Sequence, residues 1–239
     1  IKLAQLLVDV FRSQSIAVLG NVLIAMGLAA LIAFGYQYKT GEPLMNADQI
    51  AYQLHSIDPF AGTLWFAAIA GVWLFCSGII SGYFDNRSNY LNMRMRLTQH
   101  PLLKKLMSEK SRVKFANYMH ENYGSLIGNL CFGMLLGITG VVGYLTHLPL
   151  DIRHVAFSSA NVGYIAVSGQ FTYSLLLQCI GFVLLIGLVN LVVSFSLTLW
   201  VALRSLNAEI ESWWPIWYEV GQIVKKRPLS LFFPVQLDK

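Results

Sequence analysis

Charged residues are scarce in this sequence, and four long stretches contain none. Asp, Glu, Lys and Arg make up 12% of the 239 residues, whereas soluble domains carry about 25%. The uncharged stretches are residues 15–36, 61–83, 124–146 and 173–203. A helix of about 20 apolar residues crosses the hydrocarbon core of a bilayer. The composition therefore argues against a soluble globular protein and predicts four membrane-spanning helices.

Proline and histidine are also missing from the four stretches. All seven prolines fall outside them, so each span should be a continuous helix. Proton-coupled and many ion-coupled transporters need ionisable groups where the coupled ion binds. The absence of such groups argues against an autonomous pump and leaves a passive conduit or a lipid-handling bundle open.

Cysteine is rare, and its spacing is not that of a metal or redox site. Cys76, Cys131 and Cys179 all fall within predicted spans, without any CxxC motif. Such cysteines are typical of buried apolar thiols rather than of a disulfide framework or a thiolate metal site. The sequence predicts no bound cofactor.

Basic residues are distributed unevenly between the segments that join the spans. With the N-terminus in the cytoplasm, the inner segments are residues 1–14, 84–123 and 204–239. They hold 15 of the 17 Lys and Arg residues. The outer segments, 37–60 and 147–172, hold only Lys39 and Arg153. Because Lys and Arg are retained on the cytoplasmic side, both termini are predicted to be cytoplasmic.

Three parts of the sequence resemble a known family. They are Ser81–Tyr90, which includes Asp85, Asn86 and Arg87; residues 128–137; and Leu-Pro-Leu-Asp-Ile-Arg-His-Val-Ala-Phe-Ser-Ser-Ala-Asn at 148–161, which includes Asp151, Arg153, His154, Ser158, Ser159 and Asn161. From about residue 61 to 203 the chain resembles the bacterial membrane protein family named site-specific recombinase, of the Gcr type. The resemblance implies an inner-membrane protein with a longer N-terminal helical region, which agrees with the absence of a start methionine at Ile1. The family name implies DNA rearrangement.

The sequence shows no catalytic motif for DNA cleavage. Tyrosine recombinases attack the phosphate with a Tyr and stabilise the developing charge with Arg and His, commonly in an HxxR element. None of the five histidines is followed by that pattern, and the longest soluble segment, 84–123, has 40 residues. We therefore predict no catalytic residue in this chain and expect no nucleic acid partner, although an N-terminal region outside the sequence could contribute.

The inner segment 84–123 is basic and partly amphipathic. Asp85 can begin a helix and Pro101 can occupy the first turn of another, so two or three short helices are predicted. Apolar Leu102 and Leu106 alternate with basic residues such as Lys104. This pattern favours packing within the protein or on anionic lipid head groups. Docking of a protein partner and non-specific phosphate binding are the alternatives.

The outer segment 147–172 contains a weak candidate metal site. His147, Asp151 and His154 have i, i+4, i+7 spacing, so they would share one face of a single helix. Three ligands are few for a metal, and an ion pair between Asp151 and Arg153 is a simpler interpretation.

The rest of the outer segment is uncharged but short. Residues 155–169 are too few to cross a bilayer, so they predict a re-entrant or interfacial helix packed on the spans. Ser158, Ser159 and Asn161 could line a polar cavity or satisfy neighbouring backbone groups.

Small and polar residues in the spans predict helix packing, because close approach and interhelical hydrogen bonds drive association in lipid. The candidates are Gly124, Gly128, Asn129, Gly133 and Gly137 in the third span and Asn190 and Ser194 in the fourth. A conduit would instead require a cavity bordered by Asn161, Asn190 and Ser194.

The tail that follows the fourth span has the composition of an interfacial anchor. Aromatic rings prefer the head-group layer and basic residues prefer the cytoplasmic leaflet. The residues concerned are Trp213, Trp214, Trp217, Lys225, Lys226 and Arg227. Binding of a membrane or cytoplasmic protein there is the alternative.

Together these patterns predict an all-α, polytopic membrane bundle. It comprises a cytoplasmic N-terminal segment (1–14), a four-helix transmembrane domain (15–203) and a cytoplasmic interfacial tail (204–239). Three functional hypotheses follow: a non-enzymatic scaffold or anchor, a lipid or small-solute conduit, and the recombinase that the family name implies.

Overall fold

The computed structural model describes residues 2–169, 172–205, 207 and 212–231, and the described chain is helical without any strand. Four helices in it are long and apolar enough to cross a membrane: α1 (Lys2–Thr40), α3 (Thr63–Tyr90), α6 (Glu109–Thr146) and α8 (Tyr173–Ser205). The shorter elements are α2 (Ala47–Ile57), η1 (Pro59–Ala61), α4 (Met93–Gln99), α5 (Pro101–Leu106), α7 (Val155–Ala166), α9 (Trp214–Lys226) and η2 (Pro228–Leu231). The predicted all-α membrane bundle is confirmed.

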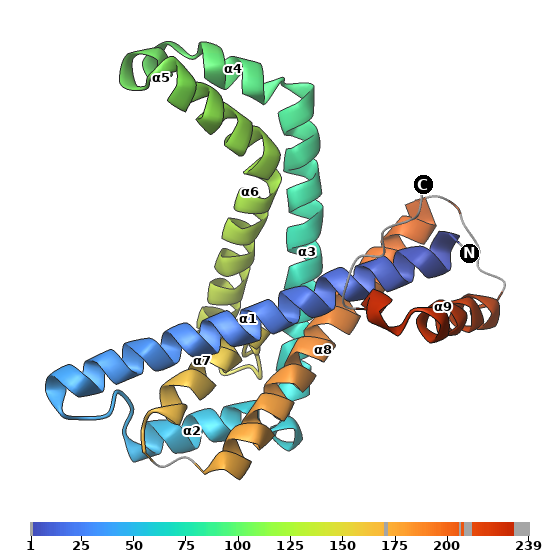
Figure 1. Cartoon of the computed structure of the whole chain (residues 1–239). Helices are drawn as coiled ribbons and strands as arrows, with labels where there is room; N and C mark the ends of the chain where they lie inside the picture. The colour runs from blue at the N-terminus through green and yellow to red at the C-terminus, as the bar shows by residue number, and fades with distance from the viewer. Residues whose placement is uncertain (1, 170–171, 206, 208–211, 232–239) are drawn as a thin grey trace.

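The long helices are arranged as two pairs that diverge. α3 packs along α6 on one side and against α8 on the other, while α1 packs mainly on α7, which also contacts α8. In Figure 1, α3 and α6 rise together to the α4 and α5 end, whereas α1 and α8 run toward the side where α9 lies. The two pairs therefore separate toward the end of the bundle that the charge distribution predicts to be cytoplasmic.

The ends of the spanning helices differ from the predicted boundaries for local reasons. α3 begins at Thr63 rather than at residue 61, because the Asp58 carboxylate caps the short η1 turn and Gly62 then adopts a left-handed φ of 81°. α1 is continuous from Lys2, so residues 2–14 of the predicted N-terminal segment are part of the first long helix.

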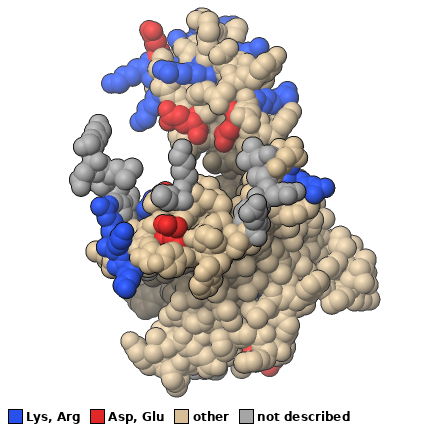
Figure 2. Space-filling model, turned by 90° about the vertical axis from the view of Figure 1, so that its right-hand side faces the viewer, with Lys and Arg blue, Asp and Glu red and all other residues tan. Residues whose placement is uncertain are grey.

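Beyond their apolar stretches, α3 and α6 continue as an arm that ends in α4 and α5. The predicted helix start at Asp85 is wrong, because Asp85 lies within α3 and its Oδ1 accepts a hydrogen bond from the Gly124 N–H at 3.0 Å. Pro101 does occupy the first turn of α5. Residues 109–123 of α6 extend about 22 Å beyond Gly124. Figure 2 shows Lys and Arg side chains gathered at this end, above a largely uncharged body.

Glycines on α6 differ in what they pack against. A Cβ at Gly124 would collide with α3, and one at Gly128 would make tight contacts of 3.0–3.1 Å with it, so both glycines favour the close approach of α3 and α6. Near Gly128, the Ser77 hydroxyl donates to the Gly128 carbonyl at 2.9 Å. The prediction for Gly133 and Gly137 is wrong within this chain, because a Cβ built at either meets no described atom within 4 Å apart from its chain neighbours and the backbone of α6 itself.

Candidate functional site

Residues 148–154 precede α7 and belong to the family-like segment 148–161. They run back alongside α6. Gly143 packs directly against the backbone of Leu150, and the His154 ring lies 5.1 Å from the Phe132 ring, centroid to centroid. Phe132 belongs to the apolar stretch of α6, so the chain has turned into the bundle by the time α7 begins. α7 itself then packs between α1 and α8. This placement favours the re-entrant over the interfacial alternative.

Asn190 is the polar centre of this region. Its Oδ1 accepts from the Val155 N–H at 3.1 Å, and its Nδ2 donates to the carbonyls of Ala67 at 2.7 Å and Arg153 at 3.1 Å. The side chain is 2% exposed. Both donors and the acceptor of the amide are therefore used, and α3, α7 and α8 are joined at one point.

Arg153 is a second junction in the same region. Its Nε donates to the Ser56 carbonyl at 2.7 Å, and its Nη1 lies 2.7 Å from Asp151 Oδ2. The guanidinium also lies over the Phe66 ring, 5.8 Å from its centroid. The ion pair between Asp151 and Arg153 is thus formed as predicted. A partly buried charge that is paired in this way positions the end of α2 against α3.

The proposed metal arrangement of His147, Asp151 and His154 is not formed. His147 ends α6 with a left-handed φ of 56°, Asp151 lies in irregular chain, and His154 caps α7. The prediction that they share one helix is wrong, and no group of three or more His, Cys, Asp or Glu in the described residues could hold a metal ion. Burial lowers the pKa of His154 to about 4, so its ring is neutral and its Nδ1 can accept from the Ala156 N–H at 3.4 Å.

The polar residues of α7 serve packing. Ser158 and Ser159 are buried, and the Ser159 hydroxyl donates to the Val155 carbonyl at 2.6 Å. Asn161 donates to Gln53 Oε1 on α2 at 2.7 Å. Ser159 thus bonds to a neighbouring backbone group, the second of the two alternatives, whereas Asn161 bonds to a side chain of another helix.

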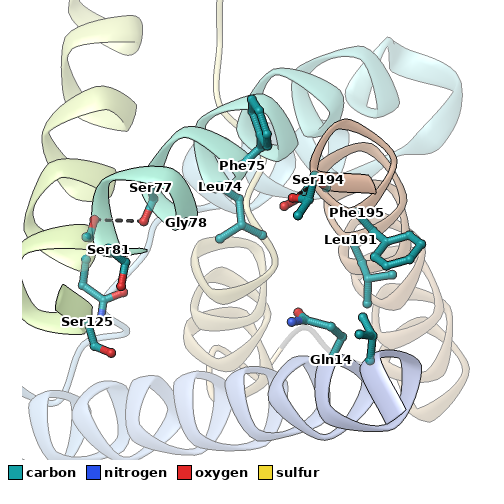
Figure 3. Close-up of a pocket in the computed structure, with 14 residues that line it drawn as sticks. Gln14, Leu74, Phe75, Ser77, Gly78, Ser81, Ser125, Leu191, Ser194 and Phe195 are labelled. Carbon is teal, nitrogen blue, oxygen red and sulfur yellow. Dashed lines mark hydrogen bonds between the residues drawn. The ribbon is translucent and has the colours of Figure 1, made fainter. Parts of the chain in front are cut away.

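A pocket of about 490 Å³ lies between α1, α3, α6 and α8, where the two helix pairs diverge (Figure 3). Its polar lining includes Gln14, Ser77, Ser81, Ser125, Asn129 and Ser194. Its apolar lining includes Leu74, Phe75, Leu191 and Phe195. The prediction of a cavity bordered by Asn161, Asn190 and Ser194 is wrong for the two asparagines, since only Ser194 lines this pocket.

The pocket lies toward one end of all four spans. Gln14 precedes the apolar stretch of α1, Ser81 is near the end of that of α3, and Ser125 is near the beginning of that of α6. These are the ends that the positive-inside rule assigns to the cytoplasm. The side chains of Gln14, Ser125 and Asn129 are exposed, so a molecule can enter from outside the bundle.

The lining of the pocket can bind a ligand but offers no group for acid–base chemistry. No lining residue is ionisable. The Ser77 hydroxyl already donates to the Gly128 carbonyl, whereas Gln14, Ser81 and Ser125 form no side-chain hydrogen bond with another described residue. The available interactions are hydrogen bonds of hydroxyl and amide groups, together with apolar contacts.

Within the described part of the tail, α9 is a short amphipathic helix that packs, with η2, on α1. Arg12 on α1 donates to the Ser230 carbonyl at 3.3 Å and pairs with Asp9 at 2.9 Å. The interfacial residues predicted from the sequence are exposed: Trp213, Trp214, Trp217, Lys225, Lys226 and Arg227. The aromatic residues are therefore available to the head-group layer, while the docking of α9 on α1 had no signal in the sequence.

Comparison with known proteins identifies a family. No curated protein and no solved structure matches the chain. A family model described as site-specific recombinase matches residues 1–234, which is nearly the whole sequence of 239 residues. The chain, a helical protein with four membrane-competent helices, therefore belongs to the site-specific recombinase family.

Proposed function

We propose that this protein is a membrane-embedded binding module that holds an amphiphilic molecule of the bilayer in the pocket between its four long helices. The observation that carries the proposal is the pocket itself, which combines uncharged polar and apolar walls. Its volume of about 490 Å³ falls within the range of small-molecule sites, about 300–1,000 Å³.

One side of the pocket is rich in serine and the other carries large apolar side chains, together with the polar Ser194 and Thr198 of α8. Figure 3 shows Ser77, Ser81 and Ser125 together where α3 meets α6, and Leu191 and Phe195 opposite them on α8. A polar head group can bond to the serine side while a hydrocarbon chain contacts the α8 side. A pocket of this size holds the head and the first part of a chain, and the remainder can stay among the lipids.

DNA recombination, which the family description names, is not supported by the residues of this chain. The sequence contains no HxxR element, and the lining of the pocket has no ionisable group to assist a nucleophile. If the purified protein cleaved DNA, and if one Tyr or Ser substitution abolished this cleavage, then recombination rather than lipid binding would be its function.

Filling the pocket should displace the bound amphiphile. Gly78 lines the pocket, and a Cβ built there meets no described atom within 4 Å. Gly78→Leu should therefore fold normally and reduce the lipid retained on purification by about tenfold, which corresponds to about 1.4 kcal/mol of binding free energy. The measurement is native mass spectrometry of the protein released from mild detergent.

Gly82→Leu is the matched control, because Gly82 lies one turn further along α3, is equally open and does not line the pocket. It should retain as much lipid as the unaltered protein. Equal retention by both variants would contradict the proposal.

A second candidate function is that of a scaffold, which the arm favours. Leu102 and Leu106 on α5 are 61% and 79% exposed, and the neighbouring Lys104 and Lys105 are exposed as well. Because residues 109–123 extend the arm by about 22 Å, its tip is held away from the bilayer and available to an acidic cytoplasmic partner.

Both proposals require the arm and the tail to lie on the same side of the membrane, which the distribution of basic residues predicts to be the cytoplasmic side, and cysteine labelling tests this. In a chain whose native cysteines are replaced by alanine, Arg94→Cys and Lys225→Cys should react with a membrane-impermeant maleimide only from the cytoplasmic side. Lys39→Cys should react only from the opposite side. Labelling of the first two positions from opposite sides would overturn the topology and both proposals.

A further inference from the structure

We infer that the head group held in the pocket is uncharged and carries a hydroxyl, as in a diacylglycerol, rather than being the phosphate of a phospholipid. The inference rests on the proposed function and specifies its ligand. It is carried by three features: the charge of the lining, the position of Asp85, and the hydrogen-bonding groups that face the pocket.

The lining gives a phosphate no partner of opposite charge. None of the residues that line the pocket is Lys, Arg or His. A phosphate that enters this lining loses part of its hydration and gains no ion pair in return. A hydroxyl or an ester loses much less on transfer and regains hydrogen bonds from the serine and amide side chains.

The nearest basic residues on two of the helices are engaged elsewhere. Arg12 on α1 pairs with Asp9 at 2.9 Å. Arg87 on α3 is exposed, and its Nη1 donates to the Tyr83 hydroxyl at 3.2 Å. Neither guanidinium lines the pocket.

A carboxylate lies next to the polar side of the pocket. Asp85 is one helical turn beyond Ser81 on α3, and its Oδ1 is fixed by the Gly124 N–H at 3.0 Å. Gly124 adjoins Ser125, which lines the pocket. A negative charge held at this place repels a phosphate and leaves an uncharged head group unaffected.

The polar side chains complement a hydroxyl, which both donates and accepts. The Ser77 hydroxyl donates its hydrogen bond to the Gly128 carbonyl, so toward a ligand its oxygen can only accept. Asn129 and Gln14 carry amide groups that can donate to a hydroxyl or ester oxygen. The pocket therefore offers both roles without any charge.

Competition between lipids tests the inference on the full chain. The delipidated protein in mild detergent is mixed with equal amounts of diacylglycerol, phosphatidylethanolamine and phosphatidylglycerol, and bound lipid is counted by native mass spectrometry. Diacylglycerol should exceed each phospholipid by at least about tenfold. This preference should disappear in Gly78→Leu and persist in Gly82→Leu.

A charge introduced into the lining should reverse the preference. Ser125 is exposed and lines the pocket, so Ser125→Lys supplies a counter-charge and should make phosphatidylglycerol the favoured ligand. Phospholipid bound preferentially by the unaltered protein, and displaced by Gly78→Leu, would overturn this inference but leave the proposed function standing. Lipid binding that is equal in Gly78→Leu and Gly82→Leu would overturn both.

Discussion

Replacement of Gly163 by leucine is expected to lower the free energy of unfolding by about 3 kcal/mol or more, because overpacking at a rigid contact forces the backbone to move. A Cβ built at Gly163 on α7 collides with the carbonyl oxygen of Met26 on α1 and lies 3.0 Å from the Ala29 Cβ. A backbone oxygen cannot rotate away as a side-chain end could, so α1 and α7 must separate. Leucine is a better helix former than glycine, so helix propensity does not account for such a loss.

The measurement is thermal unfolding of the purified protein in detergent, followed by circular dichroism. Gly181→Leu on α8 is the matched control, because Gly181 is exposed and no described atom lies within 4 Å of a Cβ built there. The control should unfold at the temperature of the unaltered protein or slightly above it. A Gly163→Leu variant as stable as this control would show that α1 and α7 do not meet as described.

Replacement of Asn190 by leucine should have a comparably large effect. The variant keeps the number and branching of the side-chain heavy atoms but removes the partners of the Val155 N–H and of the Arg153 and Ala67 carbonyls. A buried polar group left without a partner costs about 1–3 kcal/mol, so the expected loss is roughly 3 kcal/mol or more. The same thermal unfolding in detergent measures it.

Asn21→Leu is the matched control for this prediction. Asn21 lies within the apolar stretch of α1, is exposed, and forms no side-chain hydrogen bond with another described residue. Its replacement should change stability by no more than about 0.5 kcal/mol. If the two variants unfold alike, Asn190 does not join the helices that surround it.

Features of the fold that depend on local composition could be predicted from the sequence. The four spans follow from the length of their uncharged stretches, and α7 follows from a stretch that is too short to cross. The i, i+4, i+7 spacing of His147, Asp151 and His154 gave a wrong helix because spacing does not reveal where a helix ends. α6 stops at Thr146, and the left-handed His147 turns the chain away.

The pocket depends on tertiary structure, and the sequence revealed only some of its parts. Ser194 and Asn129 were selected for packing, because small and polar residues in a span usually serve that role. Gln14 was assigned to a cytoplasmic segment, since nothing in the sequence shows that α1 begins as early as Lys2. The pocket itself arises from the divergence of two helix pairs, which no local pattern encodes.

The contact of α1 with the short helix α7 also gives α1 a point about which it can tilt. Met26 and Ala29 of α1 lie against Gly163 of α7, and Gln14, at the pocket, is 12 residues from Met26, about 18 Å along the axis. A tilt of about 10° around that point would carry Gln14 through about 3 Å. Bilayer thickness acts on helix tilt. A change in thickness would therefore change the tilt of α1 and, with it, the width of the pocket.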